Sequence, residues 1–306
     1  MSLQLNTEMF QPVGKAHNAE QMVRPSMSYW QDAWRRLKKN KLAMAGLIAI
    51  AILIVMAIFG PMMQPYSYSD QNFMEANQGP SAKHWFGTDD LGRDLFVRVW
   101  YGARISLFIG VMAALIDLVI GVIYGGIAGF KGGNTDEVMM RIIEVLYAIP
   151  YLLVVIMLMV VMGQGLTSII IALGALGWMN MARLVRGQIL QLKEQEFVLA
   201  ARTLGASNKR LLFKHLIPNT LGVIIVNITF TIPSAIFTEA FLSFLGLGVP
   251  VPKASWGTLA SDALGSLIQG HAYQLFFPAL FISLTMLAFN LFGDGLRDAL
   301  DPKMRK

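Results

Sequence analysis

Residues 196–219 read EFVLAARTLGASNKRLLFKHLIPN, a charged stretch between two long apolar runs. The apolar and small residues of its first part recur at helical spacing: Phe197, Ala200, Ala201 and Leu204. Gly205 follows where a left-handed residue would end that helix, and Ser207 can cap a second one. Pro218 has no amide proton, so it suits the first turn of the next apolar run. The stretch therefore predicts two short helices joined at a glycine.

The composition of the whole chain predicts a membrane protein. Of its 306 residues, 55% are hydrophobic and 14% are charged, and the mean hydropathy is +0.53. Soluble domains carry about 25% charged residues, so this chain cannot cover itself with a polar surface. It contains no cysteine, which excludes disulfide frameworks, thiolate metal sites and cysteine nucleophiles.

Six apolar runs are long enough to cross a bilayer of about 30 Å as helices. They are 42–63, 104–128, 139–163, 166–184, 220–247 and 273–293. We therefore expect an all-α integral membrane protein with six transmembrane helices. Its expected parts are an N-terminal segment (1–41), a first transmembrane helix (42–63), a loop (64–103), a five-helix core (104–295) that includes the loop 186–219, and a tail (296–306).

The distribution of Lys and Arg predicts the orientation. With the N-terminus inside the cell, 20 of the 25 basic residues fall in the inner segments. This bias follows the positive-inside rule, so we expect both termini and the opening stretch to be cytoplasmic and the loop 64–103 to be extracellular. The opening stretch can also be interpreted as an amphipathic linker on lipid headgroups, with its basic side chains toward phosphates.

The opening stretch resembles the cytoplasmic EAA loop of bacterial ABC-importer permeases. The family pattern is Glu-Ala-Ala, three residues, Gly, nine residues, Ile, one residue, Leu-Pro. Four residues match it at the right spacing: Ala200, Ala201, Gly205 and Pro218. Three depart from it: Leu199 replaces the Glu, His215 the Ile and Ile217 the Leu. Any role of the family's glutamate therefore cannot be carried over.

Other segments resemble the oligopeptide/dipeptide group of these permeases. They are HWFGTDDLGRDLF (84–96), GARISLFIG (102–110), TEAFLSFLGLGVP (238–250), ASWG (254–257) and GDGLRDALDP (293–302). The resemblance covers about residues 30–306, and within the group the chain is similar to the C-type subunit of an oligopeptide importer. It implies the type I ABC importer permease fold and a place in the bacterial cell membrane.

The resemblance also implies partners and a mechanism. A homologous second permease would complete the pathway, two cytoplasmic ATPase subunits would dock on coupling helices, and an extracellular binding protein would deliver the peptide. The expected ATPase-coupling residues are Ala200, Ala201, Gly205, Ser207, His215 and Pro218. We expect contacts with membrane lipid and none with nucleic acid.

The motifs absent from the sequence limit its chemistry. There is no GxxxxGK[ST] phosphate loop, so we expect no enzyme activity, with ATP and Mg bound by the partner ATPases. The four histidines form no HExxH motif and no close pair, so neither zinc nor another cofactor is expected. The acidic residues Asp89, Asp90 and Asp94 of the loop suggest helix capping and binding-protein docking, or less readily calcium, because their spacing is not that of an EF-hand.

Polar and small residues within the predicted spans are candidates for the pathway or for helix packing. The ionisable and amide residues are Asp117, Glu144, Asn227 and Glu239. Such groups usually face a pathway or a partner, although for Glu239 a hydrogen bond to a neighbouring helix is an equal alternative. Scattered carboxylates make a poor proton relay. Gly121, Gly125 and Gly129 form overlapping GxxxG spacings, which suit packing within the bundle or against the second permease.

Two other functions remain open from the sequence. A relative with another cargo, such as nickel, glutathione or another small solute, would show the same pattern. An ion-coupled secondary transporter would not need the helix–turn–helix, and such proteins often show internal repeats, which this sequence does not show.

Overall fold

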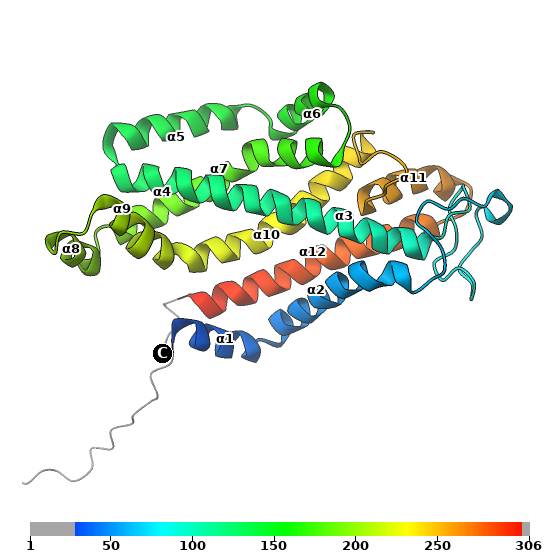
Figure 1. The fold of residues 1–306 in the computed structure, drawn as a ribbon, viewed down its shortest axis with the longest axis horizontal. Coiled ribbons are helices and arrows are strands. Elements are labelled where there is room, and N and C mark those ends of the chain that lie inside the picture. The colour runs from blue at the N-terminus through cyan, green and yellow to red at the C-terminus, as the bar shows by residue number, and fades with distance from the viewer. Residues whose placement is uncertain (1–27, 302–306) are drawn as a thin grey trace, which may run out of the picture.

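The computed structural model describes residues 28–301, which form long helices that lie side by side (Figure 1). The helices of the first half are α1 (Tyr29–Lys39), α2 (Lys41–Phe59), α3 (Leu95–Ile116), α4 (Val122–Lys131), α5 (Gly133–Ala148) and α6 (Tyr151–Met162). Those of the second half are α7 (Leu166–Leu192), α8 (Glu196–Thr203), α9 (Asn208–Arg210), α10 (Ile217–Phe244), α11 (Trp256–Ile268) and α12 (Tyr273–Leu300). Short 3₁₀ turns occur at Gly60–Met62 and Phe73–Glu75. No β-sheet occurs within 28–301.

Five continuous helices and one bent pair match the six predicted spans. The continuous spans are Lys41–Met62, Leu95–Lys131, Leu166–Leu192, Asn208–Phe244 and Tyr273–Leu300. Two of them contain a π-helical turn, η4 at Asp117–Gly121 and η5 at Leu211–Leu216. The chain is therefore an all-α, multi-pass membrane protein.

The third predicted span is not a straight helix. It consists of α5 and α6, which are bent by 80° at the break between them. Pro150 disfavours the helical conformation of Ile149 before it, and Ile149 has an extended backbone. In the predicted span 139–163, this proline is the only sign of the bend.

Helix boundaries also differ at both ends of the bundle. α3 begins at Leu95 rather than at 104, because Asp94 accepts a hydrogen bond from the amide of Val97 at 2.8 Å and caps the helix. Between the last two predicted spans (220–247 and 273–293), the chain forms α11, whose N-cap Ser255 makes a capping box with Thr258. The expected N-terminal segment 1–41 and tail 296–306 extend into residues 1–27 and 302–306, which lie outside the described residues.

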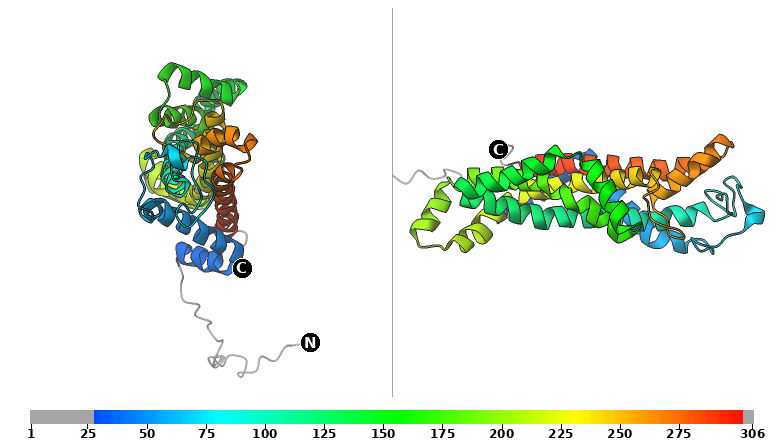
Figure 2. Two further views of the ribbon diagram at one scale, coloured as in Figure 1. Left: turned by 90° about the vertical axis from the view of Figure 1, so that its right-hand side faces the viewer. Right: turned by 90° about the horizontal axis from the view of Figure 1, so that it is seen from above.

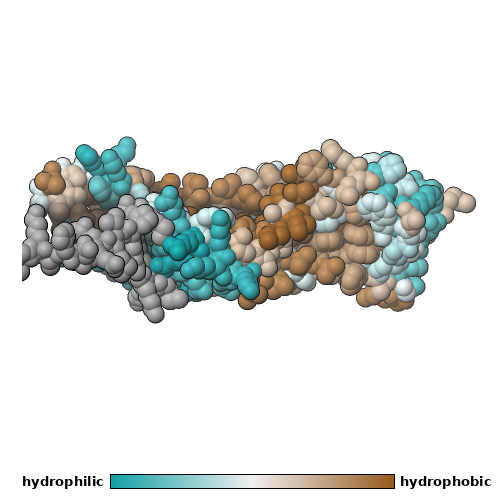
Figure 3. Space-filling model, turned by 90° about the horizontal axis from the view of Figure 1, so that it is seen from below, coloured by the Kyte–Doolittle hydropathy of each residue, from teal (hydrophilic) through white to brown (hydrophobic). Residues whose placement is uncertain are grey.

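The helices pack through small residues and leave an apolar outer surface. α2 packs on α12, α4 on α7, and α10 on α3 and α12. Figure 2 shows the narrow cross-section of the bundle and its extended length. On the face drawn in Figure 3, a hydrophobic band lies between hydrophilic regions. α2 contributes exposed Ile48, Ile52, Val55 and Phe59 to the apolar surface, as expected for a lipid-facing helix.

The two ends of the bundle differ in structure. One end carries the turn between α8 and α9, and we call it the α8 end (Figure 1). The opposite end carries residues 60–94 and α11, and we call it the loop end. At the loop end, Asp94 also binds the ring of buried His84 at 2.8 Å, and Asp89 pairs with Arg93 at 2.6 Å. No cluster of three potential metal-binding side chains occurs anywhere in 28–301.

Candidate functional sites

The turn after α8 has the geometry of a glycine-terminated helix. Gly205 has a φ of +80°, in the left-handed region. Its amide donates to the carbonyl of Arg202 at 3.0 Å, and the amide of Ala206 donates to the carbonyl of Ala201 at 3.0 Å. This pair of bonds is the Schellman motif, which satisfies carbonyls at a helix end. The Ser207 side chain then accepts from the amide of Arg210 at 3.4 Å and caps the next helix. Glycine and serine thus act locally as the sequence predicts.

The second helix of this unit differs from the expected short helix. α9 continues through the π-turn η5 into α10, so residues 208–244 form one helix. Pro218 lies directly after η5, inside this continuous helix rather than at its start, where a proline removes one backbone hydrogen bond. A movement of the turn would therefore be transmitted directly to a membrane-spanning helix.

One side of the helix–turn–helix is anchored in the bundle. Val198, Leu211 and Leu216 are fully buried, and they pack in one apolar cluster with Met181, Val185 and Ile189 of α7. This contact fixes the unit on α7 and on the base of α10.

The other side of the unit is exposed and combines apolar with basic side chains. Phe197, Leu204 and Phe213 are exposed, Leu204 to 87%. Ala200 is exposed and Ala201 half-buried. A surface hollow of about 480 Å³ is lined by Ser207, Lys209, Arg210, Phe213, Lys214 and Pro218. His215 is half-buried beside it, and its carbonyl accepts from the Asn219 side chain at 2.5 Å. The structure therefore gathers all six expected coupling residues at one end of the molecule.

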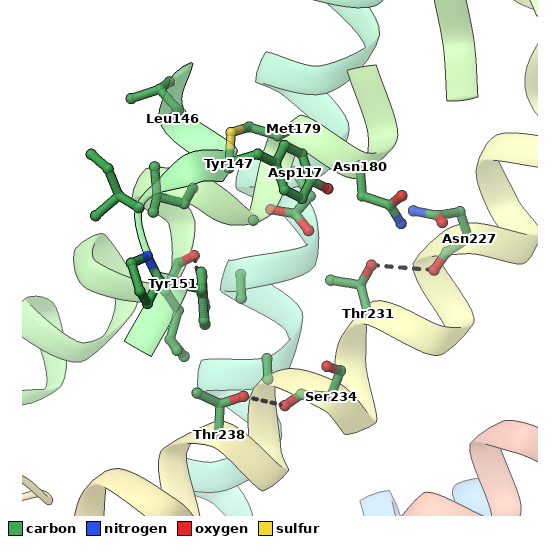
Figure 4. A pocket seen from close by; sticks show the side chains of 17 residues that line it. Asp117, Leu146, Tyr147, Tyr151, Met179, Asn180, Asn227, Thr231, Ser234 and Thr238 are labelled. Atoms are coloured by element: carbon green, nitrogen blue, oxygen red, sulfur yellow. Dashed lines mark hydrogen bonds between the residues drawn. The ribbon is translucent and has the colours of Figure 1, made fainter. Parts of the chain in front are cut away.

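A second site is a cavity of about 360 Å³ between α3, the α5–α6 break, α7 and α10 (Figure 4). Its polar lining residues are Asp117, Tyr147, Tyr151, Asn180, Asn227, Thr231, Ser234 and Thr238. The last four lie along one face of α10. The sequence prediction included Asp117 and Asn227 but missed the other six, although the spacing of the α10 residues (227, 231, 234, 238) is a helical stripe that could have indicated them.

Asp117 is the unusual member of this cavity. Its side chain belongs to the π-turn η4, the residue is only 6% exposed, and its Oδ1 atom has no hydrogen-bond partner. Gly177 of α7 makes room for it, because a Cβ at that position would lie 2.6 Å from Oδ1. A buried carboxylate without a partner is costly.

The remaining predicted residues lie elsewhere. Glu239 is fully buried outside the cavity, where its carboxylate accepts from the hydroxyls of Ser106 at 3.4 Å, Ser243 at 2.9 Å and Ser255 at 2.6 Å. These bonds join α3, α10 and the start of α11. Glu239 therefore makes hydrogen bonds to neighbouring helices, which is the second of the two alternatives given for it above. Glu144 is exposed on α5 and pairs with Arg141 at 2.8 Å.

The three glycines of the GxxxG spacings face α7 of the same chain. A Cβ on Gly121 would meet Met181, one on Gly125 would lie 2.1 Å from the Ala182 carbonyl oxygen, and one on Gly129 would lie 2.9 Å from the Arg186 carbonyl oxygen. The ridge is therefore used for close packing of η4 and α4 on α7 within this bundle.

Two known families match the chain on either side of residues 81–117. Residues 118–306 match the family described as binding-protein-dependent transport system inner membrane component. Residues 28–80 match the N-terminal TM domain of oligopeptide transport permease C. The chain belongs to this permease family. The permease thus has the type I ABC importer fold, and its family normally has no enzymatic activity of its own.

Curated relatives match the permease over almost their full length. It is 64% identical over 292 residues to the dipeptide transport system permease protein DppC of Bacillus subtilis, covering 95% of this chain and 91% of the relative. It is 62% identical to the oligopeptide transport system permease protein OppC of the same organism, over 97% and 98% of the two chains. Identity to OppC of Escherichia coli is 44%, over 94% and 95%.

Proposed function

We propose that the permease is one of two membrane subunits of an ATP-driven importer of oligopeptides or dipeptides in the bacterial cell membrane. The names of its relatives supply the cargo class, since both 62–64% identical proteins are peptide permeases. A homologous second permease would form the other half of the pathway. Two ATPase subunits would supply the free energy of ATP, bound with Mg²⁺ in their own sites, and an extracellular protein would deliver the peptide.

The observation that supports this function most is the exposed surface of the helix–turn–helix. Phe213 lines a surface hollow together with the basic residues Lys209, Arg210 and Lys214, and the turn before it exposes the apolar side chain of Leu204. An apolar centre with a charged rim is typical of a protein interface. Because α9 is continuous with α10, a partner that moves this unit would tilt a helix that lines the cavity. The unit therefore suits a mechanical contact with an ATPase at the cytoplasmic face.

The experiment is a mild-detergent pull-down of the tagged chain from its own membranes, with mass spectrometry of the proteins retained. We expect a second permease, two P-loop ATPases and a peptide-binding protein. The variant Leu204→Glu places a charge on the most exposed apolar residue of the turn and should lose the ATPases while keeping the second permease. The matched control is Ile268→Glu, which charges a residue that is 91% exposed at the loop end and should keep the ATPases.

Two results would change the assignment. A metal- or glutathione-binding protein in place of the peptide-binding one would keep the importer and replace its cargo. A chain that is recovered alone and still transports after reconstitution would instead indicate an ion-coupled transporter and contradict the proposal.

A further inference from the structure

Asp117 is a buried carboxyl group for which the residues that line its cavity provide no counter-ion. No Lys, Arg or His is among the residues that line its cavity. The other lining residues are apolar or neutral polar, and Oδ1 accepts no hydrogen bond in residues 28–301. Burial of an ionised carboxylate in such surroundings costs several kcal/mol unless a cation compensates it. A cation that enters the cavity would therefore be bound there.

The cavity lies where two helices lose their regular form. Asp117 begins the π-turn η4, near the middle of the helix Leu95–Lys131. Across the cavity, the 80° break between α5 and α6 brings Ile149, Pro150 and Tyr151 to its wall. π-turns occur often at functional sites, and irregular backbone at membrane depth is typical of substrate sites in transporters. Both irregularities therefore indicate a ligand site rather than a packing defect.

The neutral groups around Asp117 provide hydrogen-bond acceptors. Thr231 donates its hydroxyl proton to the carbonyl of Asn227 at 3.2 Å, and Thr238 donates to the carbonyl of Ser234 at 2.9 Å (Figure 4). Because these protons are already used, the hydroxyl oxygens can act toward the cavity only as acceptors. Figure 4 also shows the amides of Asn180 and Asn227 directed toward one another beside Asp117. An ammonium group has three donors and no acceptor. The Asp117 carboxylate and the two hydroxyl oxygens can accept from it, and each amide offers its oxygen as a further acceptor beside its own NH2 donor.

We propose that Asp117 is the point in the pathway that binds a primary ammonium group of the transported peptide. This inference rests on the proposed function, and it adds the group on the cargo that the permease recognises. The ammonium can come from the peptide N-terminus or from a lysine side chain. A cavity of about 360 Å³ has the size of a small-ligand site.

The first test measures the charge directly. The chain has no cysteine, so Asn180→Cys in the assembled transporter provides a single thiol of this subunit beside Asp117. Its rates of reaction with two small thiosulfonates, one carrying an ammonium and one a sulfonate, are compared. Adding Asp117→Asn should lower the cation-to-anion rate ratio about tenfold, since a neighbouring unit charge contributes on the order of 1 kcal/mol or more. Adding Glu144→Gln, which removes an exposed carboxylate outside the cavity, should leave the ratio unchanged.

The second test measures transport in proteoliposomes with the binding protein present. Asp117→Asn should reduce the maximal uptake rate of peptides about tenfold, while co-purification of all subunits and the affinity of the binding protein stay at wild-type values. Asp117→Glu, which keeps the charge, should restore part of the rate. A loss for peptides with neutral side chains assigns the ammonium to the N-terminus, and a loss confined to lysine-containing peptides assigns it to the side chain.

The outcomes separate this inference from the proposed function. If the wild-type assembly carries peptide and Asp117→Asn leaves both the rate ratio and the uptake unchanged, the ammonium site is wrong and the function stands. A second result would also overturn the ammonium site: Asp117→Asn leaves the rate ratio unchanged, but the complex loses subunits. That result would mean that a cation of the partner permease already neutralises Asp117. If the wild-type assembly carries no peptide, the proposed function itself is wrong.

Discussion

Gly205 determines the turn at the α8 end through its backbone conformation alone. A Cβ at this position would meet no atom within 4 Å, yet its φ is +80°. Gly205→Val should therefore cost about 1–3 kcal/mol of local strain, whereas Gly205→Asn should cost less because Asn tolerates the left-handed region. We expect the valine variant to insert and assemble but to transport about tenfold more slowly per ATP hydrolysed, and the asparagine variant to stay near wild type. Coupled ATPase and uptake rates measure this, and normal coupling in the valine variant would contradict the role of the turn.

Gly177 and Asp117 should behave as one unit. The three atoms nearest to a Cβ on Gly177 all belong to Asp117, with Oδ1 at 2.6 Å. Gly177→Ala should therefore displace the carboxylate and lower both the melting temperature in detergent and the uptake rate. In an Asp117→Ala background, the same substitution should lower the melting temperature and the uptake rate little further. The double-mutant cycle should therefore give a coupling free energy of about 1 kcal/mol or more. Additive effects of the two substitutions would show that Gly177 acts through another contact.

The contact of α4 with α7 offers a matched pair of glycines at the scale of the element. A Cβ on Gly125 would lie 2.1 Å from the Ala182 carbonyl oxygen, whereas one on Gly126 would be no closer than 3.7 Å to Leu212. Gly125→Ala should force the two helices apart and lower the free energy of unfolding by about 1–3 kcal/mol. Gly126→Ala should leave it unchanged or raise it slightly, since alanine favours helix. Thermal melting of the purified complex measures both, and equal melting temperatures would contradict the packing role of Gly125.

Whole elements could be predicted from the sequence when their signal is local. Apolar runs gave the six spans, and Gly205 and Ser207 gave the turn, because hydropathy, caps and left-handed residues act within a few positions. α11 was missed because this helix, which buries Trp256, is too short to form a long apolar run. The early start of α3 was missed because Arg98 interrupts the apolar sequence there. Of the eight polar residues that line the cavity, only two were among the predicted residues. Asp117 and Asn227 were identified from the cost of polar groups in membranes, but Tyr147 joins them only through the bend at Pro150 and the packing of α5 beside α7, which no local pattern specifies.

Across the whole molecule, the two ends differ in whether their basic side chains are exposed or buried. The α8 end exposes Lys209, Arg210 and Lys214 near the turn. At the loop end, by contrast, Arg93 and Arg98 are buried and both approach Asp89, with N–O distances of 2.6 and 3.3 Å. Asp89, together with Asp90 at 4.0 Å from Arg93, offsets these two buried charges, so the α8 end exposes more positive charge than this part of the loop end. By the positive-inside rule, we expect this end to be cytoplasmic.

Single cysteine substitutions test this orientation, because the natural chain has no cysteine. Gly79 is exposed at the loop end, where an added Cβ meets no atom within 4 Å, and Asn208 is exposed at the α8 end. In intact cells, or in spheroplasts if an outer membrane is present, a membrane-impermeant maleimide should label the Gly79→Cys variant fully. It should label the Asn208→Cys variant only after the membrane is opened, and the unsubstituted chain should take no label in either state. Labelling of the Asn208→Cys variant from outside would place the helix–turn–helix on the face without ATP, and a contact with ATPases at that surface would then be impossible.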